Sequence, residues 1–163
     1  MSCRDSELMV LAGIFAENSA FDVVGLEPED FEDRRNRSIY SALGRMINQG
    51  LEANLLTVTH ELRESGELTS VGIGYLGEID PVTAANIEYY AGEVRKESRK
   101  RKLKRWAQRV LESADKADPN ELLDEAETGL SLISTGKAQG FRKIGDVVHS
   151  AIDEIESLDP GLG

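Results

Sequence analysis

The stretch of sequence that decides the fold is LKRWAQRVLESADKADPNELLDEAETGLSLI, residues 103–133. Within it, Asp118-Pro119-Asn120-Glu121 predicts the start of a helix, because it combines an acidic cap, a proline at the first helical position and a glutamate three residues after the cap. One face of this helix is lined by Leu122, Ala126, Leu130 and Ile133. The preceding helix ends only a few residues earlier, so the two helices are expected to fold back as an antiparallel hairpin.

The chain before the hairpin also shows helical periodicity. A long periodic segment capped by Thr83 is predicted to run to about residue 115, and shorter helices are predicted after Ser6, across residues 34–49 and after Asn54. Residues 69–81 hold three glycines and a proline, which predicts a loop with at most one helical turn. No stretch alternates apolar and polar residues as a strand would, so the predicted fold class is all-α.

The expected organisation has three parts. Residues 1–82 form a compact helical bundle domain, residues 83–135 form the hairpin, and residues 136–163 hold a flexible break and a separate linker helix. The apolar stripe of the linker helix consists of Ile144, Val147, Val148, Ala151, Ile152, Ile155 and Leu158. A helix this short is marginal by itself, so this stripe is expected to dock on another surface.

Composition excludes several classes of protein. The chain carries 19 basic and 30 acidic residues, and its net charge of −11 disfavours coating of duplex DNA or an anionic membrane. The single cysteine, Cys3, excludes an internal disulfide and a multi-cysteine zinc site. The longest apolar run, residues 8–16, is about half of what a membrane span needs. We therefore expect a soluble cytoplasmic protein.

Two glycine-containing segments resemble nucleotide-binding motifs but lack their context. GIGYLG, residues 72–77, matches the dinucleotide fingerprint, which works only between a strand and a helix, so a turn between helices is predicted instead. Residues 129–137 fail as a phosphate loop, because Ser131 and Ala138 occupy the positions that need glycine and Ser or Thr. With no catalytic or metal-ligand pattern either, the chain is predicted to be neither an enzyme nor a cofactor binder.

Charge is unevenly distributed along this acidic chain. The acidic pairs Glu29-Asp30 and Glu32-Asp33 are predicted to lie on solvated faces. Residues 95–105 carry eight Lys or Arg side chains against Glu97 alone, a pattern that suits a nucleic-acid backbone, an acidic partner or the chain's own acidic surface. Because no aromatic side chains are interleaved for base stacking, self-pairing or exposure is favoured. The side chains assigned to such contacts are Arg95, Lys96, Arg99, Lys100, Lys102, Lys104 and Arg105.

Several short motifs occur in a characteristic order along the chain. They are ELMVLAG (7–13), LEPEDF (26–31), NRSIY (36–40), LLTV (55–58), GEL (66–68), VGIGYL (71–76) and, most specifically, PVTAANIEYY (81–90). This ordered set resembles the N-terminal domain of DnaB-type replicative DNA helicases of bacteria and phages, over almost the whole chain. One departure is Arg99 and Lys100, which stand where family members usually carry apolar residues.

The resemblance implies a non-catalytic domain that leads into a RecA-like ATPase domain, which would follow residue 163. ATP and magnesium would belong to that absent domain only. In such helicases the N-terminal domains form a collar on a hexameric ring, neighbouring hairpins pack in pairs, and the linker helix packs on the adjacent ATPase domain. The collar is where primase docks and where some loaders act.

The expected partners are therefore a second copy, as a homodimer building toward a hexamer, and primase or a helicase loader. DNA would be reached only through the full ring, and no membrane is involved. The residues assigned to the subunit interface are Tyr90, Val94, Leu103, Trp106, Val110, Leu122, Leu130 and Ile133. Two alternatives stay open: a stand-alone helical adaptor that binds a helicase or primase, and a helical nucleic-acid binder that uses residues 95–105.

Overall fold

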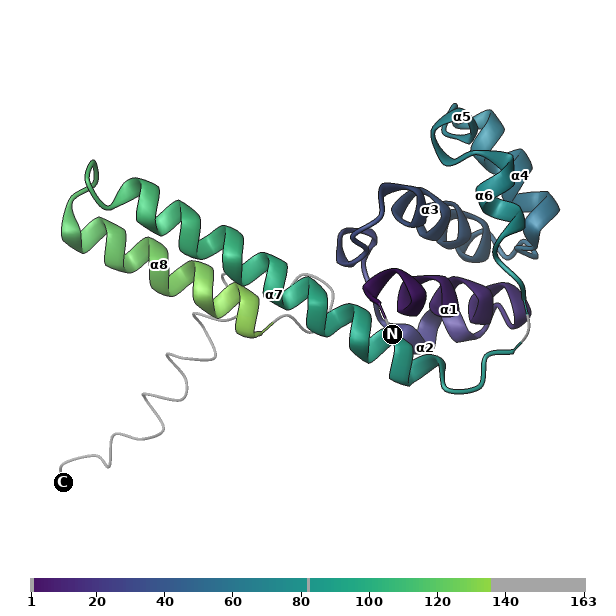
Figure 1. Cartoon of the computed structure of the whole chain (residues 1–163), viewed down its shortest axis with the longest axis horizontal. Helices are drawn as coiled ribbons and strands as arrows, with labels where there is room; N and C mark the ends of the chain where they lie inside the picture. The colour runs from purple at the N-terminus through teal and green to yellow at the C-terminus, as the bar shows by residue number, and fades with distance from the viewer. Residues whose placement is uncertain (1, 82, 136–163) are drawn as a thin grey trace, which may run out of the picture.

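The computed structural model describes residues 2–81 and 83–135, and every regular element in these ranges is helical, which confirms the all-α class. The elements are α1 (Cys3–Ala16), α2 (Ala20–Val24), the 3-10 turn η1 (Pro28–Asp30), α3 (Arg34–Asn48), α4 (Leu55–Glu64), α5 (Leu68–Val71), α6 (Ile73–Gly77), α7 (Ile87–Ser113) and α8 (Pro119–Ser134). Figure 1 shows α1 to α6 gathered in one cluster, from which α7 extends outward and α8 folds back beside its outer half. This arrangement confirms the predicted hairpin. The predicted linker helix lies outside the described residues.

The core sits among the first helices and the first half of α7. Leu11, Ile39 and Val58, from α1, α3 and α4, are completely buried, and each such side chain contributes roughly 1.5–3 kcal/mol of burial. Helix α7 joins this core through Ile87, Ala91 and Val94, one and two turns apart on one face. The hairpin is thus continuous with the globular part through a single helix.

A buried polar network ties three of these helices together. The Glu7 carboxylate is completely buried and accepts hydrogen bonds from the backbone N–H groups of Glu32 and Asp33 and from the Asn36 side chain at 2.7 Å. The Asn36 oxygen in turn accepts from the Tyr75 hydroxyl at 2.8 Å. Buried polar groups are tolerated when they are paired in this way, and here they fix α1 and α6 against the start of α3.

Several predicted helix boundaries are confirmed. The Asn54 side chain caps α4 by accepting from the N–H groups of Leu56 and Thr57, both at 3.0 Å. Asp118 caps α8 in the same way, accepting from Asn120 N–H at 2.9 Å. These boundaries were readable because capping depends only on residues a few positions apart.

Two predicted helix starts are wrong. Helix α1 begins one turn before Ser6, because Ser2 and Asp5 form a reciprocal capping box, and Ser6 itself is buried inside the helix. Helix α7 begins after Thr83, whose hydroxyl accepts from Ala85 N–H, because Asn86 has a left-handed backbone at φ 63°. A local turn therefore replaces the first predicted turn of that helix.

The loop predicted for residues 69–81 is also wrong, since it contains most of α5 and all of α6. Gly72 joins these helices with φ 84°, a conformation that an L side chain rarely adopts. Val71, Tyr75 and Leu76 from this segment are buried in the core. Tertiary burial thus outweighs the local effect of the glycines, although the predicted turn at Gly72 between helices is confirmed.

Candidate interaction surface

The base of the hairpin is fastened to the globular helices through Asp30. Its carboxylate oxygen Oδ1 accepts from Ser98 Oγ at 2.6 Å and from Lys102 Nζ at 2.8 Å, and its Oδ2 accepts from Glu27 N–H at 2.9 Å. The Asp30 carbonyl oxygen also accepts from the Arg101 guanidinium. We call Asp30, Ser98, Arg101 and Lys102 the Asp30 cluster. It links η1 to the middle of α7.

Electrostatics keep this carboxylate ionised. Burial of Asp30 acts to raise the pKa of its carboxyl, but the hydrogen bonds from Lys102, Ser98 and the Glu27 backbone outweigh it and hold that pKa below its ordinary value. The prediction of solvated acidic pairs is therefore wrong for Asp30, which is buried, and for Asp33, which caps α3 by accepting from Arg35 N–H. Sequence alone could not show that η1 lies under α7.

Other side chains of the basic stretch also bond within the chain. Arg95 donates to the Val24 carbonyl oxygen at 2.7 Å, and on α7 itself Lys96 pairs with Glu93 and Lys100 with Glu97. With Lys102 on Asp30, these contacts support the self-pairing interpretation. Arg99, Lys104 and Arg105 are exposed. The hydrogen bond from Arg101 to Asp30 was not predicted, because the sequence of the basic stretch does not show which of its side chains face η1.

Trp106 connects the two helices of the hairpin. Its indole N–H donates to the Ala126 carbonyl oxygen at 3.0 Å. A Cβ built on Gly129 would lie 2.6 Å from Trp106 Cδ1, so only glycine lets the ring approach α8 at this distance. Trp106 therefore belongs first to the inside of the hairpin.

The structure distributes the other predicted interface residues over three environments. Val94 is completely buried in this chain's own core, so it offers no surface to a second copy. Tyr90 is half-buried against that core, whereas Val110, Leu122 and Ile133 are half-buried between α7 and α8. Leu103 and Leu130 are exposed.

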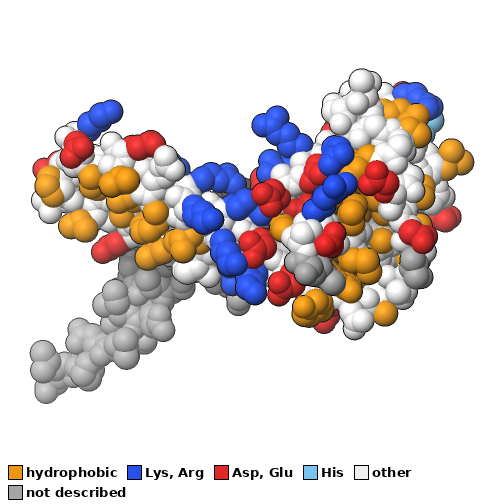
Figure 2. Space-filling view, viewed as in Figure 1, with side chains coloured by type: hydrophobic (Ala, Val, Ile, Leu, Met, Phe, Trp, Pro, Cys, Tyr) orange, Lys and Arg blue, Asp and Glu red, His pale blue; other side chains and the backbone are white. Residues whose placement is uncertain are grey.

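Three exposed leucines that the sequence prediction missed add to this apolar surface. Leu111, Leu123 and Leu132 are 74%, 60% and 59% exposed, and α8 contains no fully buried residue at all. Each lies one position along the helix from the predicted stripe, so a search for a second apolar stripe would have found them. Figure 2 shows apolar side chains along the outer hairpin and Lys and Arg side chains gathered between it and the globular helices.

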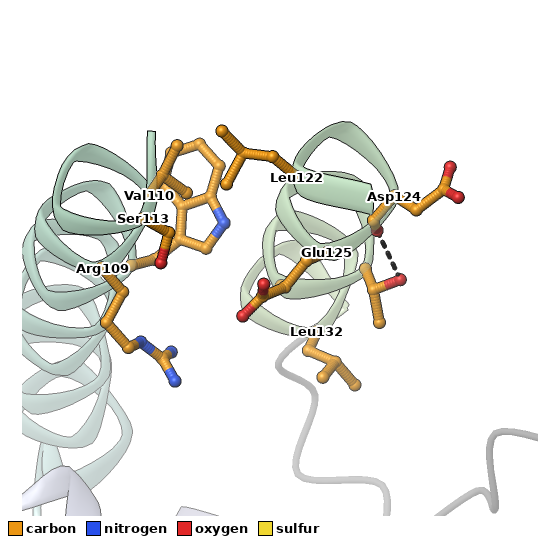
Figure 3. A pocket seen from close by; sticks show the side chains of 10 residues that line it. Arg109, Val110, Ser113, Leu122, Asp124, Glu125 and Leu132 are labelled. Carbon is orange, nitrogen blue, oxygen red and sulfur yellow. Dashed lines mark hydrogen bonds between the residues drawn. The ribbon is translucent and has the colours of Figure 1, made fainter. Parts of the chain in front are cut away.

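A groove of about 390 Å³ runs between α7 and α8. Its apolar lining includes Val110, Leu122 and Leu132, and its polar lining includes Arg109 and Glu125. In Figure 3, Leu122 and Glu125 point from α8 toward the side of the groove where Val110 and Arg109 lie. Within the described residues no group of three or more His, Cys, Asp or Glu side chains could hold a metal ion. The groove therefore combines apolar side chains with charged ones from both helices.

Comparison with known proteins identifies the family. Residues 2–96 match the profile of the family described as the DnaB-like helicase N-terminal domain. The chain belongs to this family. The DnaB-like match covers the core helices and the first part of α7; it includes Asp30 and ends two residues before Ser98.

Curated relatives extend the DnaB-like similarity further along the chain. The replicative DNA helicase DnaB of Geobacillus stearothermophilus is 36% identical over 94% of this chain, and the replicative DNA helicase DnaC of Bacillus subtilis is 35% identical over the same share. The chain spans 36% of the length of each of these relatives. It therefore corresponds to the N-terminal domain of a replicative helicase.

Solved structures agree with this DnaB-like fold. The N-terminal domain of DnaB helicase from Mycobacterium tuberculosis is 30% identical, with a TM-score of 0.72 over 77% of this chain and 94% of that domain. A DnaB-like replicative helicase, solved in a study of its interactions with primase, has a TM-score of 0.67 over 94% of this chain and 36% of that one, at 23% identity. Among residues 2–81 and 83–135, no helix is long and apolar enough to cross a membrane.

Proposed function

We propose that this chain is the non-catalytic collar domain of a hexameric replicative DNA helicase, through which subunits assemble and primase or a loader docks. The observation that carries the proposal is the apolar surface of the hairpin, where five leucines are 44–74% exposed although both helices are well formed. These are Leu103, Leu111, Leu123, Leu130 and Leu132. Contiguous apolar surface of this kind is typical of association sites.

Energetics favour covering this surface with a second hairpin. Removing exposed leucine side chains from water is worth roughly 1.5–3 kcal/mol each when burial is complete. Several leucines together offset the cost of association, which lies in the range of about 4–15 kcal/mol. A pair of hairpins forming a four-helix contact would bury the leucines of both copies at once.

The proposed function also assigns a role to each segment of the chain and to an ATPase domain. We propose that residues 1–82, 83–135 and 136–163 act as globular domain, hairpin and linker, and that the linker stripe docks on an ATPase domain. The fact that α7 is shared by the core and the hairpin supports treating the first two parts as one rigid unit. ATP and magnesium would be bound by the ATPase domain alone, and the whole helicase would work in the cytoplasm.

Self-association is tested by sedimentation equilibrium of the 163-residue chain. The double variant Leu111→Ser/Leu123→Ser should shift the mass toward the monomer, because it replaces two exposed hairpin leucines with polar side chains. The matched control is Leu56→Ser, which changes an 80% exposed leucine on α4. A wild-type chain that stays monomeric at millimolar concentration would contradict the proposal.

Docking of primase is tested separately by calorimetric titration with the primase of the same organism. We expect saturable binding that the Leu56→Ser control retains. Binding that occurs only when the ATPase domain is attached would show that docking lies outside this chain.

A further inference from the structure

The groove between α7 and α8 continues into a second hollow toward the base of the hairpin. This hollow has a volume of about 520 Å³ and shares Arg109, Gly129 and Leu132 with the lining of the groove. Its lining also includes Arg105 and Ile133. We call the two hollows together the hairpin groove.

The hairpin groove and the exposed leucines lie on different flanks of the hairpin. On α8, Leu123 and Leu132 are nine residues apart, which at about 100° per residue places them on opposite sides of the helix. On α7, Arg109 and Leu111 are about 200° apart for the same reason. Four of the exposed leucines are absent from the linings of both hollows: Leu103, Leu111, Leu123 and Leu130. Pairing of hairpins through these leucines would therefore leave the hairpin groove open.

Charges of opposite sign line the two ends of the hairpin groove. Asp124 and Glu125 lie toward the turn that joins α7 to α8, whereas Arg105 lies toward the base of the hairpin. Within residues 2–81 and 83–135, neither Arg105 nor Arg109 forms an ion pair. The groove therefore suits an apolar segment whose charges run in the opposite order.

The segment of sequence that follows α8 has this composition and this order of charges. It begins with Arg142 and Lys143, continues with the seven-residue apolar stripe, and carries Glu154 and Glu156 on either side of Ile155. In the helix that the sequence predicts here, these two glutamates border the stripe. The opposite side of that helix carries the two remaining carboxylates of the segment, Asp146 and Asp153.

The connection between α8 and this segment is long enough to reach the acidic end of the groove. Helix α8 ends at Ser134, and a rise of about 1.5 Å per residue places Asp124 roughly 15 Å back along the helix. Residues 135–141 can span roughly 20 Å, so Arg142 can lie near Asp124. A connection this short gives an effective concentration on the order of millimolar, which favours the segment of the same chain over that of another copy.

We propose that residues 142–158 dock in the hairpin groove of their own chain, running from the turn toward the base. The apolar stripe covers the apolar middle of the groove, and Glu154 and Glu156 pair with Arg105 and Arg109. This contact goes beyond the proposed function, because it uses the flank opposite the leucines of the proposed subunit contact. An ATPase domain that bound the stripe would empty the groove, so the two docking places are alternatives.

Nucleic acid fits the hairpin groove less well than this segment. A phosphate backbone would pair with Arg105 and Arg109, but Asp124 and Glu125 would repel it. It would also leave Leu132 and the other apolar side chains of the groove open to water. The segment after α8 satisfies both the apolar middle and the charged ends.

Hydrogen exchange of the 163-residue chain, followed by mass spectrometry at low micromolar concentration, tests the contact. Amides of residues 147–155 should exchange roughly tenfold or more slowly than the intrinsic rates of an unstructured chain, because docking holds the segment in its helix. Exchange of these amides at the intrinsic rates would overturn the inference.

Charge reversals test which surface holds the segment. Arg105→Glu/Arg109→Glu should remove the protection of residues 147–155, and so should Glu154→Lys/Glu156→Lys. The four changes combined in one chain should restore it, because they exchange the two signs and keep the contacts. The matched control changes the net charge by the same amount at two exposed cations that do not line the groove, Lys104→Glu/Lys116→Glu. Protection that survives either groove reversal would overturn the inference.

The outcomes separate this inference from the proposed function. Protection of residues 147–155 that disappears on tenfold dilution would assign the segment to the groove of another copy and overturn docking within one chain. Loss of protection in Leu111→Ser/Leu123→Ser would show that the two flanks form one surface, which also overturns it. A chain that stays monomeric but keeps the charge-dependent protection would contradict the proposed subunit contact and support this inference.

Discussion

Asp30 combines burial with a set of hydrogen bonds that reaches across the junction between the globular helices and the hairpin. Its partners Ser98 and Lys102 lie 68 and 72 residues away in sequence. A carboxylate with a pKa held below its ordinary value stabilises the folded state at every pH where it is ionised. The Asp30 cluster therefore stabilises the orientation of α7 relative to the globular helices.

Replacing Asp30 with Ala should lower the free energy of unfolding by about 2 kcal/mol, because it leaves the Ser98 hydroxyl and the Lys102 ammonium without their acceptor. Urea unfolding followed by circular dichroism measures the change. The neighbouring Glu29→Ala is the matched control, and it should change stability by less than about 0.5 kcal/mol since Glu29 is exposed. An equal effect of both substitutions would remove the special role of Asp30.

The contribution of Asp30 should also depend on pH. The pKa of Asp30 in the folded state lies below the value of about 4 that it has in the unfolded chain. The stabilisation is therefore complete above about pH 4–5, and it is lost as the pH falls through the folded-state pKa. The stability difference between wild type and Asp30→Asn should therefore be constant from pH 6 to pH 8 and shrink in more acidic solution. A difference that grew on acidification would contradict the assigned direction.

At the scale of the element, the hairpin depends on close contact between α7 and α8 at one place. The single tryptophan of the chain, Trp106, lies on Gly129 and bonds to Ala126. No residue of α8 is fully buried within one chain. Because Val110, Leu122 and Ile133 are only half-buried between the helices, the Trp106 contact is expected to contribute much of the stability of the hairpin.

Gly129→Val should displace the indole and destabilise the chain by about 1–3 kcal/mol, the usual cost of overpacking. Fluorescence of Trp106 should shift to longer wavelength as the ring becomes exposed. The matched control is Gly92→Ala on α7, where a new Cβ meets nothing within 4 Å. That change should raise stability by roughly 0.5–1 kcal/mol through helix propensity alone.

Hydrogen exchange should distinguish the two parts of the chain. Amides of α8 should exchange much faster than those of α1 at micromolar concentration, because α8 buries no residue within one chain whereas α1 is largely buried. Their protection should rise with protein concentration as hairpins pair. Protection of α8 equal to that of α1, and independent of concentration, would argue against an unpartnered hairpin.

At the scale of the whole molecule, the globular helices and the outer hairpin differ in how their charged side chains are paired. The globular helices pair many of their charges internally, as Arg45 does with Glu61 and Glu67. The outer hairpin carries exposed Lys104, Arg105 and Arg109 on α7, exposed carboxylates on α8 and exposed leucines on both helices. Assembly through the hairpin is then expected to respond both to salt and to loss of leucine side chains.

Raising sodium chloride from 0.05 to 0.5 M should weaken the dimer several-fold, because salt screens the attraction of the exposed Lys104, Arg105 and Arg109 for carboxylates of a second copy. Sedimentation velocity measures the dissociation constant at each salt concentration. For Leu111→Ser/Leu123→Ser the salt dependence should persist although affinity is lower. A dimer that tightens steadily with salt would show that apolar contact alone directs assembly.

The amino-acid sequence determined the class of fold, the hairpin and most helix boundaries. Asp118 and Pro119 start α8, and Asn54 starts α4, because capping acts through groups within one helical turn. The ordered motifs that resemble the DnaB-type domain also come from sequence, and the family match confirms that resemblance. The exposed leucines beside the predicted stripe were readable from the same periodicity.

Only the tertiary structure decided which charged side chains are used inside the chain and which face outward. Asp30 looked like one of several solvated carboxylates until η1 was seen to lie under α7, and Val94 looked like an interface residue until α7 was seen to enter the core. Tertiary structure also decided that residues 68–77 are helical, because Val71 of α5 and Tyr75 and Leu76 of α6 are buried in the core. Burial and pairing depend on residues dozens of positions apart, and no local pattern encodes which of them meet.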